Sequence, residues 1–173
     1  MAASSMQFAQ DERGPGTKRI QPGWAAVAGV TAASLAQSGF LGPLEAYEGR
    51  FGFFPFYMGS RVEACDYNLA TRGLGVSWED DRNAIKPYPA CHFSHAFADA
   101  ARLIREKHDI LVEDVARITA RVPEKIVGIV CEPLANKRRP TSSHAAQFSL
   151  PYAIASAFVR GCYGLAEMEA EAR

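Results

Sequence analysis

The sequence lacks an excess of charge of either sign, since its 173 residues include 19 Lys plus Arg and 19 Asp plus Glu. Proteins that bind nucleic acid usually carry a basic excess, so no nucleic-acid partner is expected. No uninterrupted apolar stretch reaches the ~18 residues that cross a bilayer, so no membrane partner is expected either. The N-terminal residues do not combine a basic segment with an apolar one, which predicts no secretory signal and a cytoplasmic protein.

Common metal-binding and nucleotide-binding motifs are also missing. The cysteines form no CxxC pair, and the chain has no Walker loop, no HExxH, no GxSxG and no GxGxxG after a predicted strand. Scattered cysteines in a cytoplasmic chain are expected to be reduced thiols. Cys91 and His95 are spaced for one helix face, but a closed zinc site needs four ligands. The Cys and His residues outside positions 91–95 show no paired spacing, so no metal is expected.

The apolar content is sufficient for a core, at 48% hydrophobic residues with 10 Phe. Residues 24–39 follow Pro22 and are mostly small, which predicts a helix that is buried in a bundle and ends at Gly39. Residues 40–59 are interrupted by Gly and Pro but contain clustered aromatic side chains, which usually belong to a core.

The pattern changes near residue 85, where we expect a domain boundary. A helix is predicted over 144–161, with Ser142 or Ser143 as its cap and a kink at Pro151. Another helix is predicted to run to about residue 107, with His92 in solvent and an apolar face at helical spacing made of Phe93, Phe97, Ala100 and Ile104.

Two extended segments are predicted between these helices. Residues 115–122 (VARITARV) alternate loosely between apolar and polar side chains, which favours a strand. Residues 125–133 (KIVGIVCEP) indicate a second extended segment that ends at Pro133. The order of elements therefore predicts an α+β fold, with an all-helical part followed by an α+β part.

Basic residues that precede predicted helices are candidates for an anion site. Lys18 stands before the first helix, and residues 137–139 form a basic turn before the last one. Helix N-termini and guanidinium groups both favour carboxylates, although a solvated basic loop is the commoner outcome for such a run. Lys86 lies in a stiff, mostly apolar segment between Ile85 and Pro87, which also favours a specific role.

Four blocks of the sequence resemble consecutive blocks of the MmgE/PrpD family. They are TKRIQPGWAAVAGVTAASLAQSGFLGP, LEAYEGRFGFF, IKPYPACHFSHAFADAARLI and KRRPTSSHAAQFSLPYAIASAF. The family includes 2-methylcitrate dehydratase, cis-aconitate decarboxylase and iminodisuccinate epimerase. The resemblance implies that residues 1–85 are the C-terminal portion of its helical domain and residues 86–173 the N-terminal portion of its α+β lid domain.

The resemblance also implies a cleft that binds di- and tricarboxylates without metal or organic cofactor. By position in the matching blocks, Lys18, Lys86 and His95 correspond to catalytic residues, and Cys91 and Arg139 to substrate-binding residues. Cations would hold the carboxylates and stabilise an enolate-like intermediate, and a histidine is the usual acid or base. Lysine could serve as the acid if burial lowered its pKa.

The chain departs from the family in two ways. Family chains are much longer, so we expect an incomplete catalyst that acts as a homodimer or with a complementing chain. Gln21 stands where the family commonly has a histidine, and an amide cannot transfer a proton at neutral pH. The expected function is a lyase step on a citrate-like acid, with 2-methylcitrate dehydration first and a decarboxylase or epimerase as alternatives. A non-catalytic remnant that binds a carboxylate or another chain is the competing hypothesis.

Overall fold

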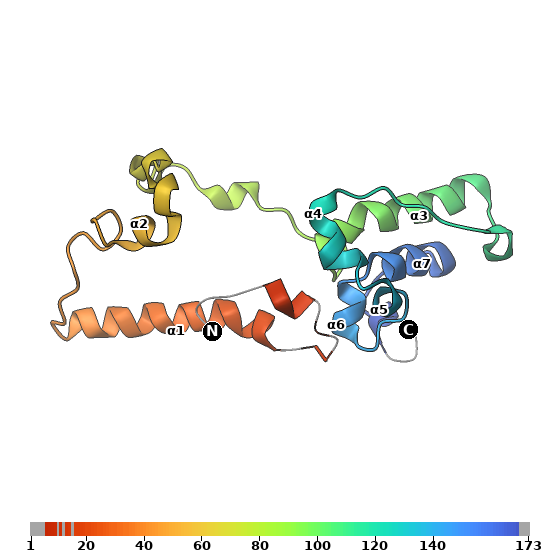
Figure 1. The fold of residues 1–173 in the computed structure, drawn as a ribbon, viewed down its shortest axis with the longest axis horizontal. Helices are drawn as coiled ribbons and strands as arrows, with labels where there is room; N and C mark the ends of the chain where they lie inside the picture. The colour runs from red at the N-terminus through yellow and green to blue at the C-terminus, as the bar shows by residue number, and fades with distance from the viewer. Residues whose placement is uncertain (1–5, 10, 12, 15, 170–173) are drawn as a thin grey trace. The chain divides into compact units, whose positions relative to one another are not determined.

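The computed structural model describes residues 6–9, 11, 13, 14 and 16–169, and within them the chain forms helices and loops without a strand (Figure 1). The predicted α+β class is therefore wrong for the described residues, which are helical. The α-helices are α1 (Thr17–Gln37), α2 (Phe53–Met58), α3 (His95–His108), α4 (Glu124–Ile126), α5 (Leu134–Arg138), α6 (Ser143–Gln147) and α7 (Leu150–Arg160).

Short helical turns join these elements. No helix in the described ranges is both long and apolar enough to span a membrane. A π-helix, η7, spans Val127–Cys131. The 3-10 helices are η1 (Met6–Ala9), η2 (Gly59–Ala64), η3 (Tyr67–Ala70), η4 (Glu79–Arg82), η5 (His92–Ser94), η6 (Val112–Asp114) and η8 (Ala166–Met168).

The chain divides into two compact units, one made of Met1–Gly23 with Ile85–Arg173 and the other of Trp24–Ala84. The first division falls inside α1. The helix predicted after Pro22 is confirmed, but it begins earlier, at Thr17, and none of its residues is buried. The expectation of a helix inside a bundle is therefore wrong for the described residues, because within the Trp24–Ala84 unit no other element covers α1.

The aromatic cluster of the Trp24–Ala84 unit was expected in a core and is exposed instead. Every residue of this unit is described, and none is buried. The rings contact one another: Phe53 lies 5.5 Å from Phe54 and 4.7 Å from Tyr57 between ring centroids. Yet Phe51 is 88% and Phe56 78% exposed. A short helix and 3-10 turns give these rings only each other to pack against.

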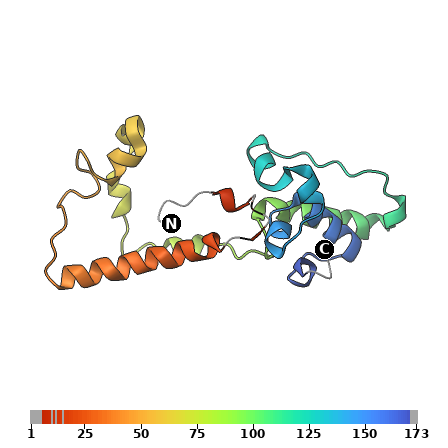
Figure 2. The same ribbon diagram turned by 60° about the horizontal axis from the view of Figure 1, so that its bottom comes forward.

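The other unit contains the hydrophobic core, in which α3 lies along α7 (Figures 1 and 2). Alanines line the contact on both helices, so that their backbones approach closely: Ala98 and Ala101 face Ala153 and Ala157 within one cluster of buried residues. The helix is confirmed, and Phe93 and Phe97 of its predicted apolar face pack against the core. The other two residues of that face, Ala100 and Ile104, are exposed.

Neither predicted extended segment is a strand. Residues 115–122 have no regular structure, and no other described segment pairs with them. Residues 124–131 form α4 and η7, where the Glu132 amide donates to the Val127 carbonyl at 3.1 Å. β-branched residues stabilise a strand only where a partner strand supplies the hydrogen bonds of the ladder. No described segment does so here, and the backbone of residues 124–131 is hydrogen-bonded locally, as a helix.

The helix predicted over 144–161 is two helices. Ser142 caps α6 by accepting from the Ala145 amide at 3.0 Å, which confirms it as one of the two candidate caps. Buried Ser149 caps α7 by accepting from the Tyr152 amide at 3.0 Å. Pro151 therefore lies in the first turn of α7, where its missing N–H costs no hydrogen bond. The predicted kink at Pro151 is wrong, because the helix is interrupted before Pro151 and a second helix begins.

Candidate functional site

A cavity of about 310 Å³ opens beside the first turn of α1 and the segment that precedes α3. Its volume is at the lower end of the range for small-molecule sites. All of its lining residues belong to the unit that contains the core. They are Lys18, Lys86, Pro89, Ala90, Cys91, His92, Phe93, Gln147 and Phe148.

Lys86 is positioned by a tight loop. Its Nζ donates a hydrogen bond to the Ala90 carbonyl at 3.2 Å, and the Ala90 amide donates to the Tyr88 carbonyl at 2.8 Å. The Cys91 amide donates to the Gln147 carbonyl at 2.8 Å, which ties the loop to the end of α6. Two prolines in this loop fix their own φ angles, so that the Lys86 ammonium is held with little backbone freedom.

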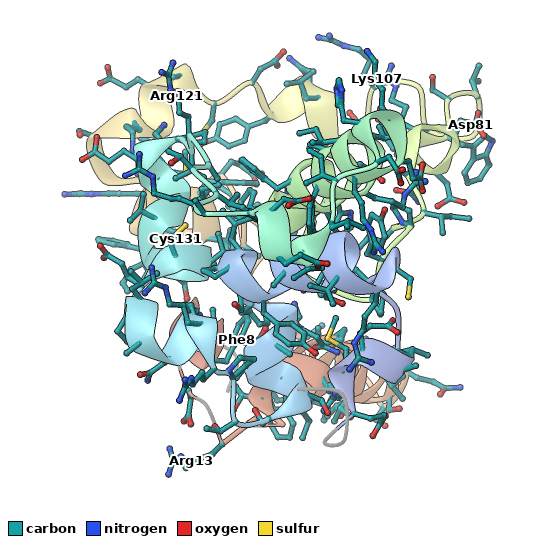
Figure 3. The ribbon with its side chains drawn as sticks, turned by 90° about the vertical axis from the view of Figure 1, so that its right-hand side faces the viewer. Phe8, Arg13, Asp81, Lys107, Arg121 and Cys131 are labelled. Carbon is teal, nitrogen blue, oxygen red and sulfur yellow. The ribbon has the colours of Figure 1, made fainter. Side chains whose placement is uncertain are left out.

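Lys18 lies in the first turn of α1, near the N-terminal end of the sequence and far from Lys86 along the chain. Its Nζ is 5.1 Å from the centroid of the Phe8 ring and 6.0 Å from that of Phe148. These are cation–π distances. Figure 3 shows Phe8 beside the helices near the C-terminal end of the chain, drawn in blue.

The two histidines of the segment occupy different environments. His95 is half-buried, and its Nε2 donates to the Ala90 carbonyl at 3.3 Å. Burial lowers the pKa of His95, and the nearby positive charges of Lys86 and His92 lower it further. His95 is not among the lining residues, whereas His92, which was expected in solvent, is exposed and lines the cavity.

The other predicted site residues are divided between the cavity and the surface. Cys91 is half-buried, has a free thiol and lines the cavity. Arg139 is exposed at the end of α5 and does not line it. Gln21 does not line it either, and its Nε2 is buried with no hydrogen-bond partner among the described residues.

Gln147 and Phe148 line the cavity but were not predicted as site residues. A polar amide within the apolar run AAQFS was the available signal for Gln147. Phe148 gave none, because a buried aromatic ring in a helix is usually core.

The lining suits an anion that bears carboxylates. It includes the ammonium groups of Lys18 and Lys86, the imidazole of His92 and the amide of Gln147, but no Asp or Glu. Hydrogen bonds between ammonium and carboxylate are short and about twice as strong as neutral ones. Within the described residues, no group of three His, Cys, Asp or Glu side chains is placed to hold a metal ion.

Comparison with protein families gave two matches. Residues 1–64 match the MmgE/PrpD N-terminal domain, and residues 88–173 match the MmgE/PrpD C-terminal domain. Searches of curated proteins and of solved structures gave no match. The cavity takes Lys18 from the first matched segment and residues 89–93 from the second, and Lys86 lies just before the second.

Proposed function

The chain belongs to the MmgE/PrpD family, and we propose that it binds a citrate-like di- or tricarboxylate in the cavity between Lys18 and Lys86. The observation that supports this proposal is the convergence of two ammonium groups, from distant parts of the sequence, on one small cavity without lining carboxylates. Two cations can each hold one carboxylate of such a ligand.

We propose 2-methylcitrate dehydration as the first reaction to test. A base removes a proton next to a carboxylate, the leaving hydroxyl takes a proton, and water departs as the double bond forms. Ammonium groups lower the barrier by stabilising the enolate-like charge that develops. His92 lines the cavity and is the candidate for proton transfer. His95 lies outside the lining and acts as a positioning residue, through its hydrogen bond to the Ala90 carbonyl. Decarboxylation and epimerisation need the same stabilised anion and are the alternative reactions.

Carboxylate binding without turnover is the second candidate function. It is supported by the hydrogen bond from His95 Nε2 to the Ala90 carbonyl. This bond occupies the N–H of His95, which the family resemblance predicted as the acid or base. The amide of Gln21, in place of the family's histidine, supports it as well. A binding protein would retain affinity for citrate and release no unsaturated product.

We further propose that the chain works as a homodimer or with a complementing chain. The support is the exposed apolar surface of the Trp24–Ala84 unit, where Trp24 is 42%, Phe56 78% and Trp78 68% exposed. Exposed apolar patches of this kind mark interfaces in soluble proteins. Sedimentation of the purified chain would reveal a dimer or larger species, and a stable monomer at all concentrations would contradict the proposal.

Calorimetric titration of the full chain with citrate and with 2-methylcitrate tests the binding proposal. Lys86→Met should weaken binding about tenfold or more, because a charge-assisted hydrogen bond is lost. Lys107→Met removes an exposed lysine of α3 outside the cavity and is the matched control, with unchanged affinity expected. Ultraviolet absorbance of the new conjugated double bond reports dehydration. Equal affinities for all three proteins would overturn the assignment of the cavity.

A further inference from the structure

The N-terminal turn η1 is anchored to helices α5 and α6 by side-chain hydrogen bonds. The His144 Nε2 donates to the Phe8 carbonyl at 2.7 Å, and the Lys137 Nζ donates to the Ala9 carbonyl at 3.3 Å. All four of these residues are buried. The turn is thus held by two side chains that follow it by more than a hundred positions in the sequence.

The anchored turn places the Phe8 ring against two others, those of His144 and Phe148. The ring centroids of Phe8 and Phe148 are 5.9 Å apart at an interplanar angle of 69°, an edge-to-face arrangement. The Phe8 and His144 rings are 6.4 Å apart at 71°. Phe8 is 7% exposed and Phe148 4%, so that both rings are fixed in place by packing.

Lys18 is placed by this ring pair. Its Nζ lies within cation–π range of both rings, at 5.1 and 6.0 Å from their centroids. Within the described residues no carboxylate forms an ion pair with Lys18. A free lysine side chain has many rotamers, and part of this rotamer entropy is lost when the ammonium binds a ligand. The rings therefore restrict the ammonium before any ligand arrives.

We propose that Phe8 is a positioning residue for Lys18: η1 brings its ring under the ammonium and so holds that charge at the cavity. The effect on ligand affinity rests on the proposed carboxylate-binding function, but the placement of Lys18 does not. Removal of a cation–π contact at an exposed lysine corresponds to roughly 0.5–1 kcal/mol, or about a two- to fivefold weaker affinity for citrate.

The first measurement is made on the unchanged full chain in the absence of ligand. Nuclear magnetic resonance should show the Lys18 ε-methylene protons shifted upfield by the ring currents, with cross-peaks to ring protons of Phe8. Absence of both signals in the folded protein would overturn the proposal, whatever the behaviour of any variant.

Substitutions then separate the ring from its volume. Phe8→Leu keeps an apolar side chain but should abolish the Phe8 contribution to the shift and weaken citrate binding two- to fivefold. Phe8→Tyr should restore both. Leu103→Ala truncates an apolar side chain on α3 that is 52% exposed and outside the cavity, and should change neither.

The outcomes are distinct. If Phe8→Leu leaves the Lys18 shift and the citrate affinity unchanged, or if Phe8→Tyr fails to restore them, Phe8 does not position Lys18. If the unchanged chain binds no citrate but shows the ring-current shift, and Phe8→Leu abolishes it, the positioning is supported while the carboxylate-binding function fails.

Discussion

Lys86 and His95 donate hydrogen bonds to the same carbonyl oxygen, that of Ala90, at 3.2 and 3.3 Å. A carbonyl oxygen has two lone pairs and can accept both bonds. Since the carbonyl only accepts, His95 must carry a proton on Nε2, which leaves Nδ1 unprotonated when the ring is neutral. The shared acceptor holds the two side chains close together. The charge of Lys86 therefore opposes a second proton on His95 and lowers its pKa.

The first prediction concerns the titration of His95. Its pKa should lie below the ordinary value of 6.5, first because the ring is partly desolvated and then because Lys86 is close. Lys86→Met should raise it, whereas Lys107→Met should leave it unchanged. Nuclear magnetic resonance of the ring protons against pH measures all three values.

The same shift predicts how stability depends on pH. Below pH 6.5 the unfolded His95 binds a proton more readily than the folded one. Its contribution to the free energy of unfolding therefore falls as pH falls from 6.5 towards the folded-state pKa, and is constant above 6.5. A pKa of His95 at or above 6.5, or no response to Lys86→Met, would contradict this account.

The second prediction concerns the core between α6 and the C-terminal segment. Tyr163 is 1% exposed, and its hydroxyl donates to the Ala146 carbonyl at 3.0 Å. Tyr163→Phe should lower the free energy of unfolding by about 1 kcal/mol, the net value of one hydrogen bond. The loss is limited because the Ser149 amide still donates to the same carbonyl, at 3.2 Å.

Thermal unfolding measures this loss, which corresponds to a fall in Tm of roughly 2–4 °C for a chain of this size. Tyr57→Phe is the matched control, since that ring is 67% exposed, and it should have no effect. Equal stability of Tyr163→Phe and the unchanged chain would show that the hydroxyl is not needed in the core.

Helices could be predicted from the sequence where the signal is local. The α3 helix follows from apolar residues at helical spacing, and the cap of α6 was narrowed by residue type to two serines, of which Ser142 is the one observed. Burial could not be predicted in the same way. The small residues of α1 are typical of a close helix–helix contact, but whether a neighbour is present depends on distant segments. Residues 115–122 failed as a strand for the same reason, because a strand requires a partner.

The site could be predicted in part. Lys18, Lys86 and Cys91, identified from the family resemblance, line one cavity, although their catalytic and binding roles remain predictions. Neither composition nor spacing could bring Lys18 to Lys86, because that depends on tertiary packing. The proximity of Phe8 to Lys18 could not be predicted from the sequence either, since the hydrogen bonds that anchor η1 join residues far apart in the sequence.

The last prediction tests the connection between η1 and α1. Gly14 has φ of +69°, and a Cβ added there would lie 3.1 Å from the Cβ of His144. Gly14→Ala should therefore cost about 1–2 kcal/mol in backbone strain alone, and the crowding should disturb the His144 bond to the Phe8 carbonyl. The Lys18 ring-current shift should decrease with it, because Phe8 would no longer be fixed.

Gly16→Ala is the matched control two residues further along the chain. A Cβ added at Gly16 meets no atom within 4 Å, and its φ is not in the left-handed region. This substitution should be neutral or stabilise the protein by up to about 1 kcal/mol, since alanine restricts the unfolded chain more than glycine does. Urea unfolding of the two variants gives both free energies. If Gly14→Ala matched Gly16→Ala in stability and kept the Lys18 shift, the close approach of Gly14 to His144 would have no part in holding η1.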